Sequence, residues 1–284
     1  MKLKKIAKVL LSAVIAGVLF TGCGQDDNAD NKENTSASSK AKLGMISKMN
    51  VSEENYNSFL QKYETKVGRK FSYQIIFYDD LNSMQLGLQS KNIDAMSLYT
   101  CVGNYIVSKD SKTEIVKYTA LDLTDSFCFA IREEDSELKD SFDGVIKSMK
   151  DDGTLDNLVQ TYITDLKEDP PAVDIKNISG ADTIKVGITG DLPPLDLVLA
   201  NGQPAGFNTA VLSEISKRIN KNIELIQIDS AARAAALTSK QVDVVFWVVV
   251  PQDDKRPADM DKPAGVSVTT PYYQDEVVHI GLKK

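Results

Sequence analysis

The chain contains an internal repeat of two short segments. The letters KLGMI at residues 42–46 recur as KVGIT at 185–189, and LQSKNID at 88–94 recurs as LTSKQVD at 237–243. Each half is therefore expected to open on a strand that runs into a helix, and later to pass from a helix through a polar turn into a buried strand. This pattern predicts two similar α/β lobes. Because ligands of open α/β sheets bind at the carboxyl ends of the strands, a small molecule is expected in a cleft between the lobes.

Hydrophobic periodicity predicts the order of elements around the repeats. Apolar residues at helical spacing predict helices at 52–63, 81–89, 102–108, 138–149, 155–163, 208–219 and 231–237. Alternating or wholly apolar runs predict strands at 42–47, 71–78, 94–98, 114–121, 126–132, 183–189, 223–228, 242–250 and 274–282. Strands and helices thus alternate through both halves.

The first 23 residues predict export and lipid anchoring. Lysines at positions 2, 4, 5 and 8 precede an uncharged apolar run at 9–20, which is followed by the letters TGC at 21–23. The run is shorter than the roughly 20 residues of a membrane-spanning helix, so residues 1–22 are predicted to be a signal peptide. Small residues before Cys23 resemble the lipobox of bacterial lipoproteins, which implies a diacylated Cys23 that holds the protein to the membrane. An ordinary secretory signal with an incidental cysteine is the alternative.

A flexible tether is expected between the anchor and the folded part. Residues 24–40 contain no large apolar side chain and are rich in Asp, Asn, Ser and Lys, so they bury too little surface to fold. As a flexible coil such a segment spans about 20–25 Å. The predicted organisation is a tether at 23–41, one lobe at 42–125 and a second lobe at 126–284. The second lobe includes a proline-marked connector at 165–182.

Composition excludes some classes of function. The net charge is −7 and the isoelectric point is near 4.9, whereas nucleic-acid binders carry a basic surface. His279 is the only histidine and lies in an apolar run, so neither a metal site nor a cofactor is expected. Besides Cys23 the chain has Cys101 and Cys128, which either form a disulfide or remain free; the spacing favours neither outcome.

Several motifs resemble one protein family. The letters KVGI at 185–188, PP at 193–194, NG at 201–202, GFN at 206–208, LTSKQVD at 237–243 and TPYY at 270–273 resemble the first lobe of the family 3 solute-binding proteins. Residues 137–162, with DDGTL at 151–155, resemble the helices that close that family's chain. The resemblance covers nearly everything after the tether. It implies a two-lobed, type II periplasmic-binding-protein-like fold in which each lobe has a central sheet flanked by helices, with a hinge of two crossing strands.

The order of these blocks is rotated relative to the family. There the first-lobe block comes first and the DGT helices come last, whereas here residues 137–162 precede the strand at 185. The chain therefore resembles a circular permutation in which 42–121 is the family's second lobe, 126–133 crosses to the first lobe and 276–282 returns to the hinge. Permutation is tolerated where chain ends lie close together on the surface. Two incomplete tandem domains are the alternative.

The residues that grip the ligand differ from the family pattern. The family binds an α-amino acid with an arginine on its carboxylate and acidic groups on its ammonium. The resemblance implies an arginine shortly after the 242–250 strand, where Lys255 and Arg256 stand, and acids at two positions that hold Tyr99 and Thr189. A less charged or more aromatic pocket is therefore expected.

Eight residues are expected to line the ligand site. The segment after the first strand runs into a helix start, whose backbone N–H groups can bind an anionic group. Other candidates stand at strand ends that match ligand-lining positions of the family, and the one tryptophan either faces the ligand or packs in the core. The candidates are Ser47, Met49, Asn50, Tyr99, Thr100, Ser230, Trp247 and Arg256.

The resemblance implies a lipid-anchored extracytoplasmic receptor of an ABC importer. It is expected to be a monomer that closes on a small polar solute, an amino acid or a related metabolite, and presents it to a membrane permease. One alternative is an enzyme on the same scaffold, which needs a positioned acid or base in the cleft; the sequence places no such carboxylate pair or histidine there. Another is a sensor or accessory lipoprotein that binds a partner protein.

Overall fold

A computed structural model describes residues 40–68, 70–71, 73–116, 123–252 and 256–284. The predicted signal peptide, Cys23 and nearly all of the predicted tether lie outside these residues. No helix in the described ranges combines the length and the apolarity that crossing a membrane requires.

The first group of elements, here called the amino lobe, is built on a five-stranded sheet. Its strands lie in the order β2-β1-β3-β13-β4. β1 pairs in parallel with β2 and β3, and β13 is antiparallel to both β3 and β4. The strands are β1 (Ala41–Ile46), β2 (Tyr73–Tyr78), β3 (Ala95–Tyr99), β4 (Thr113–Val116) and part of β13 (Tyr273–Leu282).

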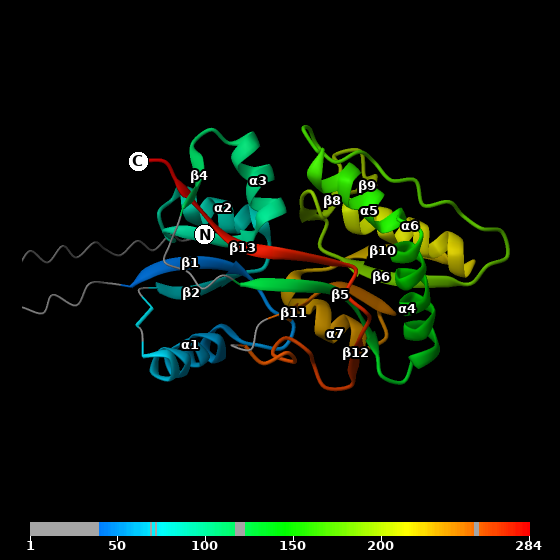
Figure 1. Cartoon of the computed structure of the whole chain (residues 1–284), viewed down its shortest axis with the longest axis horizontal. Coiled ribbons are helices and arrows are strands. Elements are labelled where there is room, and N and C mark those ends of the chain that lie inside the picture. The colour runs from blue at the N-terminus through cyan, green and yellow to red at the C-terminus, as the bar shows by residue number, and fades with distance from the viewer. Residues whose placement is uncertain (1–39, 69, 72, 117–122, 253–255) are drawn as a thin grey trace, which may run out of the picture. The chain divides into compact units, whose positions relative to one another are not determined.

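Helices cover both faces of this sheet, but unequally. α1 lies along one face and contacts β2, whereas α2 and α3 lie on the other face and contact β13 (Figure 1). The right-handed crossovers β1–α1–β2 and β2–α2–β3 run in opposite directions across the sheet, which places their helices on opposite faces. The helices are α1 (Glu53–Val67), α2 (Leu81–Gln89) and α3 (Thr100–Lys109).

The second group, here called the carboxyl lobe, repeats this plan. Its sheet has the order β10-β6-β11-β5-β13, and β12 also pairs with β5. α6 packs with α4 and α5, whereas α7 packs against β11, β5 and β6. A small sheet of β7, β8 and β9 lies between β6 and α6 along the chain. The strands are β5 (Thr124–Arg132), β6 (Thr183–Ile188), β7 (Asp191–Leu192), β8 (Asp196–Val198), β9 (Pro204–Ala205), β10 (Asn222–Gln227), β11 (Val244–Pro251) and β12 (Val266–Val268). The helices are α4 (Ser136–Asp151), α5 (Thr154–Val159), α6 (Phe207–Ile219) and α7 (Arg233–Thr238).

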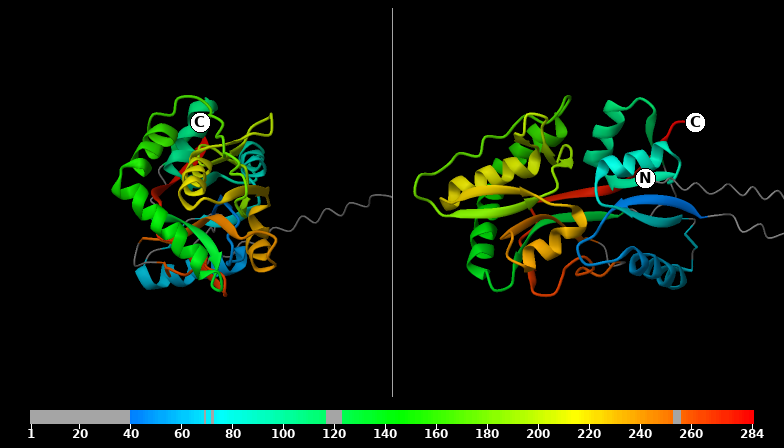
Figure 2. Two further views of the ribbon diagram at one scale, coloured as in Figure 1. Left: turned by 90° about the vertical axis from the view of Figure 1, so that its right-hand side faces the viewer. Right: turned by 180° about the vertical axis from the view of Figure 1, so that it is seen from behind.

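β13 belongs to both sheets. Its residues 273–276 pair with 124–127 of β5, and its residues 277–282 pair with β3 and β4 (Figure 2). β5 begins beside this transition, where the Val277 N–H also donates to the Leu123 carbonyl at 2.8 Å. The predicted α/β fold, in which each lobe has a central sheet flanked by helices, is confirmed. The strands β5 and β13, which pair antiparallel, join the two lobes.

The repeated segments form the same hydrogen bonds in both lobes. The carboxylates of Asp94 and Asp243 accept the backbone N–H of Lys42 at 2.7 Å and of Lys185 at 2.9 Å. The preceding lysines of the two repeats have φ angles of 60° and 63°, a left-handed conformation that ends the helix. The sequence repeat is therefore a turn that ends α2 or α7, followed by an aspartate that ties the next strand to its neighbour.

Some predicted boundaries differ from the structure. The strand predicted at 114–121 is described only as Thr113–Val116, because residues 117–122 lie outside the described ranges. The helix predicted at 102–108 already begins at Thr100, and the one predicted at 155–163 ends in a π-helical turn, Gln160–Thr164. Cys101 and Cys128 are both buried and are not joined in a disulfide.

Candidate functional site

The two lobes touch through direct hydrogen bonds at the carboxyl ends of their parallel strands. Asp261 of the carboxyl lobe accepts from the backbone N–H groups of Met49 at 2.6 Å and Asn50 at 3.1 Å. Arg233 donates from Nη2 to the Ser47 carbonyl at 2.8 Å. Together these bonds tie the β1–α1 loop of the amino lobe to two segments of the carboxyl lobe.

A third contact lies at the start of α2. Asp191 of the carboxyl lobe accepts the Leu81 N–H at 2.7 Å, so a carboxylate caps this helix from the opposite lobe. Burial is the main cause that raises the pKa of Asp191. Near it, the Asp196 carboxylate accepts both the N–H and the hydroxyl of Thr189, at 2.9 Å and 3.0 Å, and burial raises the pKa of Asp196 to about 6. Thr189, which stands where the family has an acid, therefore lies beside acids supplied from β7 and β8.

A largely apolar pocket begins at the contact between the two lobes and extends into the amino lobe. One wall is α1, which contributes Tyr56, Phe59, Leu60 and Tyr63. These residues recur at the spacing of one helical face, and the Phe59 and Tyr63 rings stack with centroids 6.0 Å apart. The helix is positioned by its N-cap, since the Ser52 hydroxyl accepts the Asn55 N–H at 3.2 Å.

The opposite wall is the amino-lobe sheet. Strands β1 and β2 contribute aliphatic and aromatic side chains, and β3 and β13 contribute Ser97, Tyr99, Val277 and His279. His279 is 8% exposed, and burial lowers its pKa to about 4, so its imidazole is neutral at pH 7. This wall therefore carries no formal charge at neutral pH.

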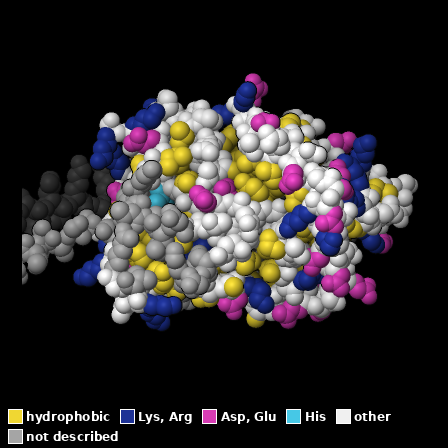
Figure 3. Space-filling view, viewed as in Figure 1, with side chains coloured by type: hydrophobic (Ala, Val, Ile, Leu, Met, Phe, Trp, Pro, Cys, Tyr) yellow, Lys and Arg dark blue, Asp and Glu magenta, His cyan; other side chains and the backbone are white. Residues whose placement is uncertain are grey.

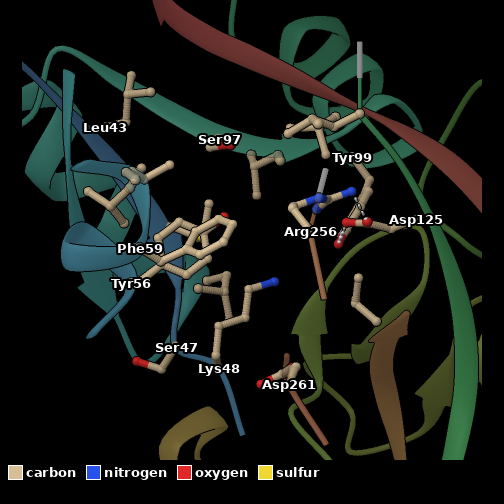
Figure 4. A pocket seen from close by; sticks show the side chains of 18 of the residues that line it. Leu43, Ser47, Lys48, Tyr56, Phe59, Ser97, Tyr99, Asp125, Arg256 and Asp261 are labelled. Atoms are coloured by element: carbon tan, nitrogen blue, oxygen red, sulfur yellow. Dashed lines mark hydrogen bonds and ion pairs between the residues drawn. The ribbon is translucent and has the colours of Figure 1, made fainter. Parts of the chain in front are cut away.

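An ion pair marks the polar end of the pocket. The Arg256 Nη2 lies 2.6 Å from Asp125 Oδ1, and the side chains are only 10% and 2% exposed. The other Asp125 oxygen accepts the Tyr99 hydroxyl at 2.8 Å, and burial together with Asp125 raises the pKa of Tyr99 well above its usual value. Lys48 extends its ammonium toward the open space in front of these groups (Figure 4). The pocket thus combines an apolar body with a charged end.

The structure brings three of the eight candidates to the pocket. Ser47, Tyr99 and Arg256 line it. The N–H groups of Met49 and Asn50, predicted to bind an anionic group, are bonded to Asp261, and the Met49 side chain packs against the carboxyl lobe.

The other candidates lie away from the pocket or outside the described side chains. Thr100 donates to the Glu276 carbonyl at 3.0 Å, beside the strand that joins the lobes. Ser230 is buried, and its carbonyl accepts from Arg233 Nε at 2.9 Å. Trp247 lies in β11 at a shift of register between Phe246 and Val248, but its side chain lies outside what the structure describes.

Sequence reasoning missed the residues that the fold recruits from far away. Asp261 lies in a charged loop and Arg233 in an alanine-rich helix, and neither position carried a signal in the sequence. The aromatic face of α1 did carry one, because the helical spacing of its apolar residues was visible, but the sequence did not indicate that this face lines a pocket. On the surface, Lys and Arg are interspersed with Asp and Glu over the face drawn in Figure 3, rather than gathered into a field of one sign.

The comparisons with known proteins agree with the predicted family. Residues 184–281 match the model of the bacterial extracellular solute-binding proteins, family 3. This range begins in β6 and ends in β13, so it contains most of the carboxyl lobe. The predicted resemblance to this family is confirmed for residues 184–281, and the permuted order stays a prediction. No curated protein sequence matches the chain.

Solved structures similar to this chain include binding proteins of low identity. A ligand-binding component of an ABC-type import system from Staphylococcus aureus, with zinc bound, is 11% identical with a TM-score of 0.43; the match covers 85% of this chain and only 65% of that one. The methionine-binding protein MetQ is 11% identical over 87% of this chain and 84% of its own, with a TM-score of 0.41. The GluR0 ligand-binding core from Nostoc punctiforme, in complex with L-glutamate, is 9% identical over 86% and 85%, with a TM-score of 0.38.

Proposed function

We propose that this protein is an extracytoplasmic solute receptor of an ABC-type import system, anchored by a lipid on Cys23, that binds a small solute between its two lobes. The observation that carries the proposal is the family match at 184–281, together with the site where both lobes present polar groups from the carboxyl ends of their parallel strands. In two-lobed proteins such a junction opens and closes about the connecting strands, here β5 and β13.

In this proposal the solute competes with groups of the chain itself. Asp261 holds two backbone N–H groups that precede α1, and Arg256 is paired with Asp125. An anionic solute group that enters the junction takes over either the N–H pair or the guanidinium. Binding and release then exchange internal hydrogen bonds for bonds to the solute, which keeps the buried polar groups satisfied in both states.

A thermal-shift screen of the chain without residues 1–23 tests this function. The panel contains amino acids, short peptides, and other metabolites. A solute that binds only the folded protein raises its stability by RT ln(1 + [L]/Kd), or about 2.7 kcal/mol at a hundredfold excess over Kd. A saturable shift with one solute class, without turnover, supports the receptor. Product formation would instead show an enzyme, and silence across the panel would favour a partner-binding lipoprotein.

Arginine variants test whether the solute binds at the contact between the lobes. Arg256→Ala is expected to abolish the response to carboxylate solutes. Arg256→Lys keeps a cation beside Asp125 but loses the planar fork, so it is expected to retain a weakened response. Arg218→Ala is the matched control, since Arg218 bonds Ser148, Asp152 and Thr154 away from the pocket. Unchanged carboxylate binding by Arg256→Ala would show that this arginine is not the contact.

Fractionation of cells tests the lipid anchor. Radiolabelled palmitate is expected to be incorporated into the full chain, which should sediment with membranes. Cys23→Ser is expected to lose the label and to move to the soluble fraction, because the single anchoring cysteine is gone. Cys128→Ser serves as the control, since Cys128 is buried in the fold. Labelled protein in the Cys23→Ser variant would exclude this anchor.

Binding is proposed rather than catalysis because the acids at the pocket are engaged in structural bonds. Asp125 is held by Arg256 and Tyr99, and Asp261 by backbone N–H groups. A general acid or base must instead reach the proton that it transfers in the bound substrate. Steady turnover of any solute that binds would overturn this choice.

A further inference from the structure

The two lobes differ in how one face of each sheet is covered. In the carboxyl lobe, β5 is followed by α4, which packs beside α6 and against β5. In the amino lobe, β13 takes the place of β5 in the strand order, and α1 takes the place of α6. Within the described residues, however, no second helix lies beside α1 (Figure 1). The β3–β13 side of this face is where the pocket lies.

The walls of the pocket suit an apolar group. Tyr56, Phe59 and Tyr63 of α1 face Leu43 and Ile75 of the sheet, which are both buried. Burial of the Tyr56 ring raises the pKa of its hydroxyl to about 12, so this wall is neutral as well. Transfer of a hydrocarbon chain or an aromatic ring from water to such walls is favourable. A small polar solute would lose its hydrogen bonds to water there without gaining new ones.

Ser97 is a small residue in the sheet wall of the pocket. It is 7% exposed, and its neighbours along β3 are large apolar residues. A short side chain at this position leaves room between α1 and the sheet. Lining residues follow β3 from Ser97 to Tyr99, whose hydroxyl bonds Asp125 at the polar end (Figure 4). We therefore expect a bound molecule that is elongated along this strand.

The polar end favours an anionic head group. Both carboxylates there are already engaged, Asp125 with Arg256 and Asp261 with the Met49 N–H. Lys48 lines the same end, and no acid lies within ion-pair distance of its ammonium among the described residues. A ligand carboxylate in front of Lys48 supplies a negative partner for its ammonium.

The geometry points to an elongated amphipathic carboxylate as the ligand, with its aliphatic or aromatic body between α1 and β3–β13 and its carboxylate at Lys48. This inference rests on the proposed receptor function and replaces the small polar solute expected from the sequence with an apolar-bodied one. The pocket, rather than the bonded contact between the lobes, then determines which solute is accepted.

Isothermal titration with hexanoate, octanoate and decanoate tests the apolar body. Each methylene that enters the pocket is expected to tighten binding about fourfold, until the pocket is full. Octanamide has the same body without the charge, and is expected to bind about three- to tenfold more weakly than octanoate. Affinity that does not change with chain length would overturn the inference.

Pocket variants test the location. Ser97→Leu fills the space beside the sheet wall of the pocket and is expected to weaken octanoate binding at least tenfold. Circular dichroism and thermal unfolding are used to verify the fold. Phe59→Ala, on the partly exposed wall, is a second variant with less effect on folding and is expected to weaken binding severalfold. Leu86→Ala is the matched control, because Leu86 lies on α2, is 63% exposed and does not line the pocket. Its affinity should equal that of the unaltered protein.

Lysine variants test the head group. Lys48→Gln is expected to remove the preference for octanoate over octanamide while leaving octanamide binding unchanged. Lys62→Gln, at an exposed position of α1, is expected to keep that preference.

The outcomes distinguish the inference from the receptor proposal. Octanoate binding that survives both Ser97→Leu and Phe59→Ala would place it elsewhere and overturn the inference. A polar solute that binds in an Arg256-dependent manner, while the carboxylates do not bind, would overturn the inference but leave the receptor proposal standing. Binding of neither class would overturn both.

Discussion

The Asp261 carboxylate accepts the backbone N–H of Met49 at 2.6 Å, across 212 positions of sequence and from one lobe to the other. The same oxygen accepts the Asn50 N–H, and Asp261 is only 5% exposed. A side chain of the carboxyl lobe therefore occupies a pair of donors where the sequence predicted an anionic ligand group.

Asp261→Ala is expected to loosen the contact between the lobes. Charge-assisted hydrogen bonds contribute about 1.5–3 kcal/mol each, so this variant should lose stability of that order and populate open forms more often. Small-angle X-ray scattering should then give a larger radius of gyration than for the unaltered chain. Asp259→Ala, at an exposed position of the same loop, is the control. Equal radii for the two variants would show that Asp261 does not hold the lobes together.

The buried pair of Asp125 and Arg256 is expected to behave differently from exposed pairs. Arg256→Ala leaves a carboxylate that is 2% exposed without its cation, which typically costs about 3–5 kcal/mol. The double change Asp125→Asn with Arg256→Gln removes both charges and should recover part of this loss. Lys147→Ala breaks a pair whose side chains are 75% and 63% exposed, and should change stability by less than about 1 kcal/mol. Urea denaturation measures all three, and equal effects of Arg256→Ala and Lys147→Ala would contradict the expectation.

His279 is expected to make stability depend on pH in one direction. Burial lowers its pKa from 6.5 to about 4, so between these values the unfolded chain binds a proton that the folded chain does not. Stability contributed by the neutral imidazole is therefore fully present above pH 6.5 and is lost as the pH falls toward 4, by at most about 3 kcal/mol. Asp196, whose pKa is raised to about 6, titrates in the opposite sense over part of this range, so the curve must be compared with that of His279→Gln. A constant difference between the two curves from pH 7 to pH 4 would contradict this assignment.

The turn that ends α2 offers a backbone test. Lys91 has a φ of 60°, a region that costs a residue with a Cβ atom about 1–2 kcal/mol and glycine little. Lys91→Gly is therefore expected to be more stable than Lys91→Ala by about 1 kcal/mol in thermal unfolding. At an ordinary helical position the order is reversed, so an alanine variant of greater stability would show that the turn relaxes.

The predicted circular permutation can be reversed experimentally. Asp94, just before β3, bonds Lys42 of β1 on one side and lies beside Gly281 of β13 on the other. Residues 40 and 284 therefore lie near the same end of the amino-lobe sheet. Two strand spacings are about 10 Å, which a linker of about five residues spans. A chain opened between 165 and 182 and joined from 284 to 40 should fold, with a circular dichroism spectrum and a melting temperature close to those of the original order. An unfolded product would argue against permutation.

Much of the fold was visible in the sequence because it depends on local patterns. The period of two in β2, the wholly apolar β11 and the helical spacing of α1 and α4 come from residues that are neighbours along the chain, and these elements appear where they were predicted. The repeated aspartates Asp94 and Asp243 lie at equivalent positions, because their bonds join elements that the repeat itself defines. Boundaries next to the π-helical turn Gln160–Thr164 and the 3₁₀ turn Ser230–Ala232 were less accurate, since such turns change the period.

The candidate site could be predicted only where strand ends define it. Ser47 and Tyr99 follow directly from the ends of β1 and β3, and both line the pocket. Met49 and Asn50 precede α1 as expected, but no local pattern indicated Asp261 as the partner of their N–H groups.

The sequence by itself determined two α/β lobes, their order of strands and helices, and the polar turns that end the helices, because each of these depends on contacts between residues close along the chain or on a pattern written twice. The tertiary structure decided which charges meet and where the apolar pocket lies. Asp125 pairs with Arg256 across 131 positions of sequence, and α1 has no neighbouring helix in the described part of the amino lobe. Both features depend on how strands from distant segments of the chain are brought together in space. Burial then sets their energies, which no local pattern encodes.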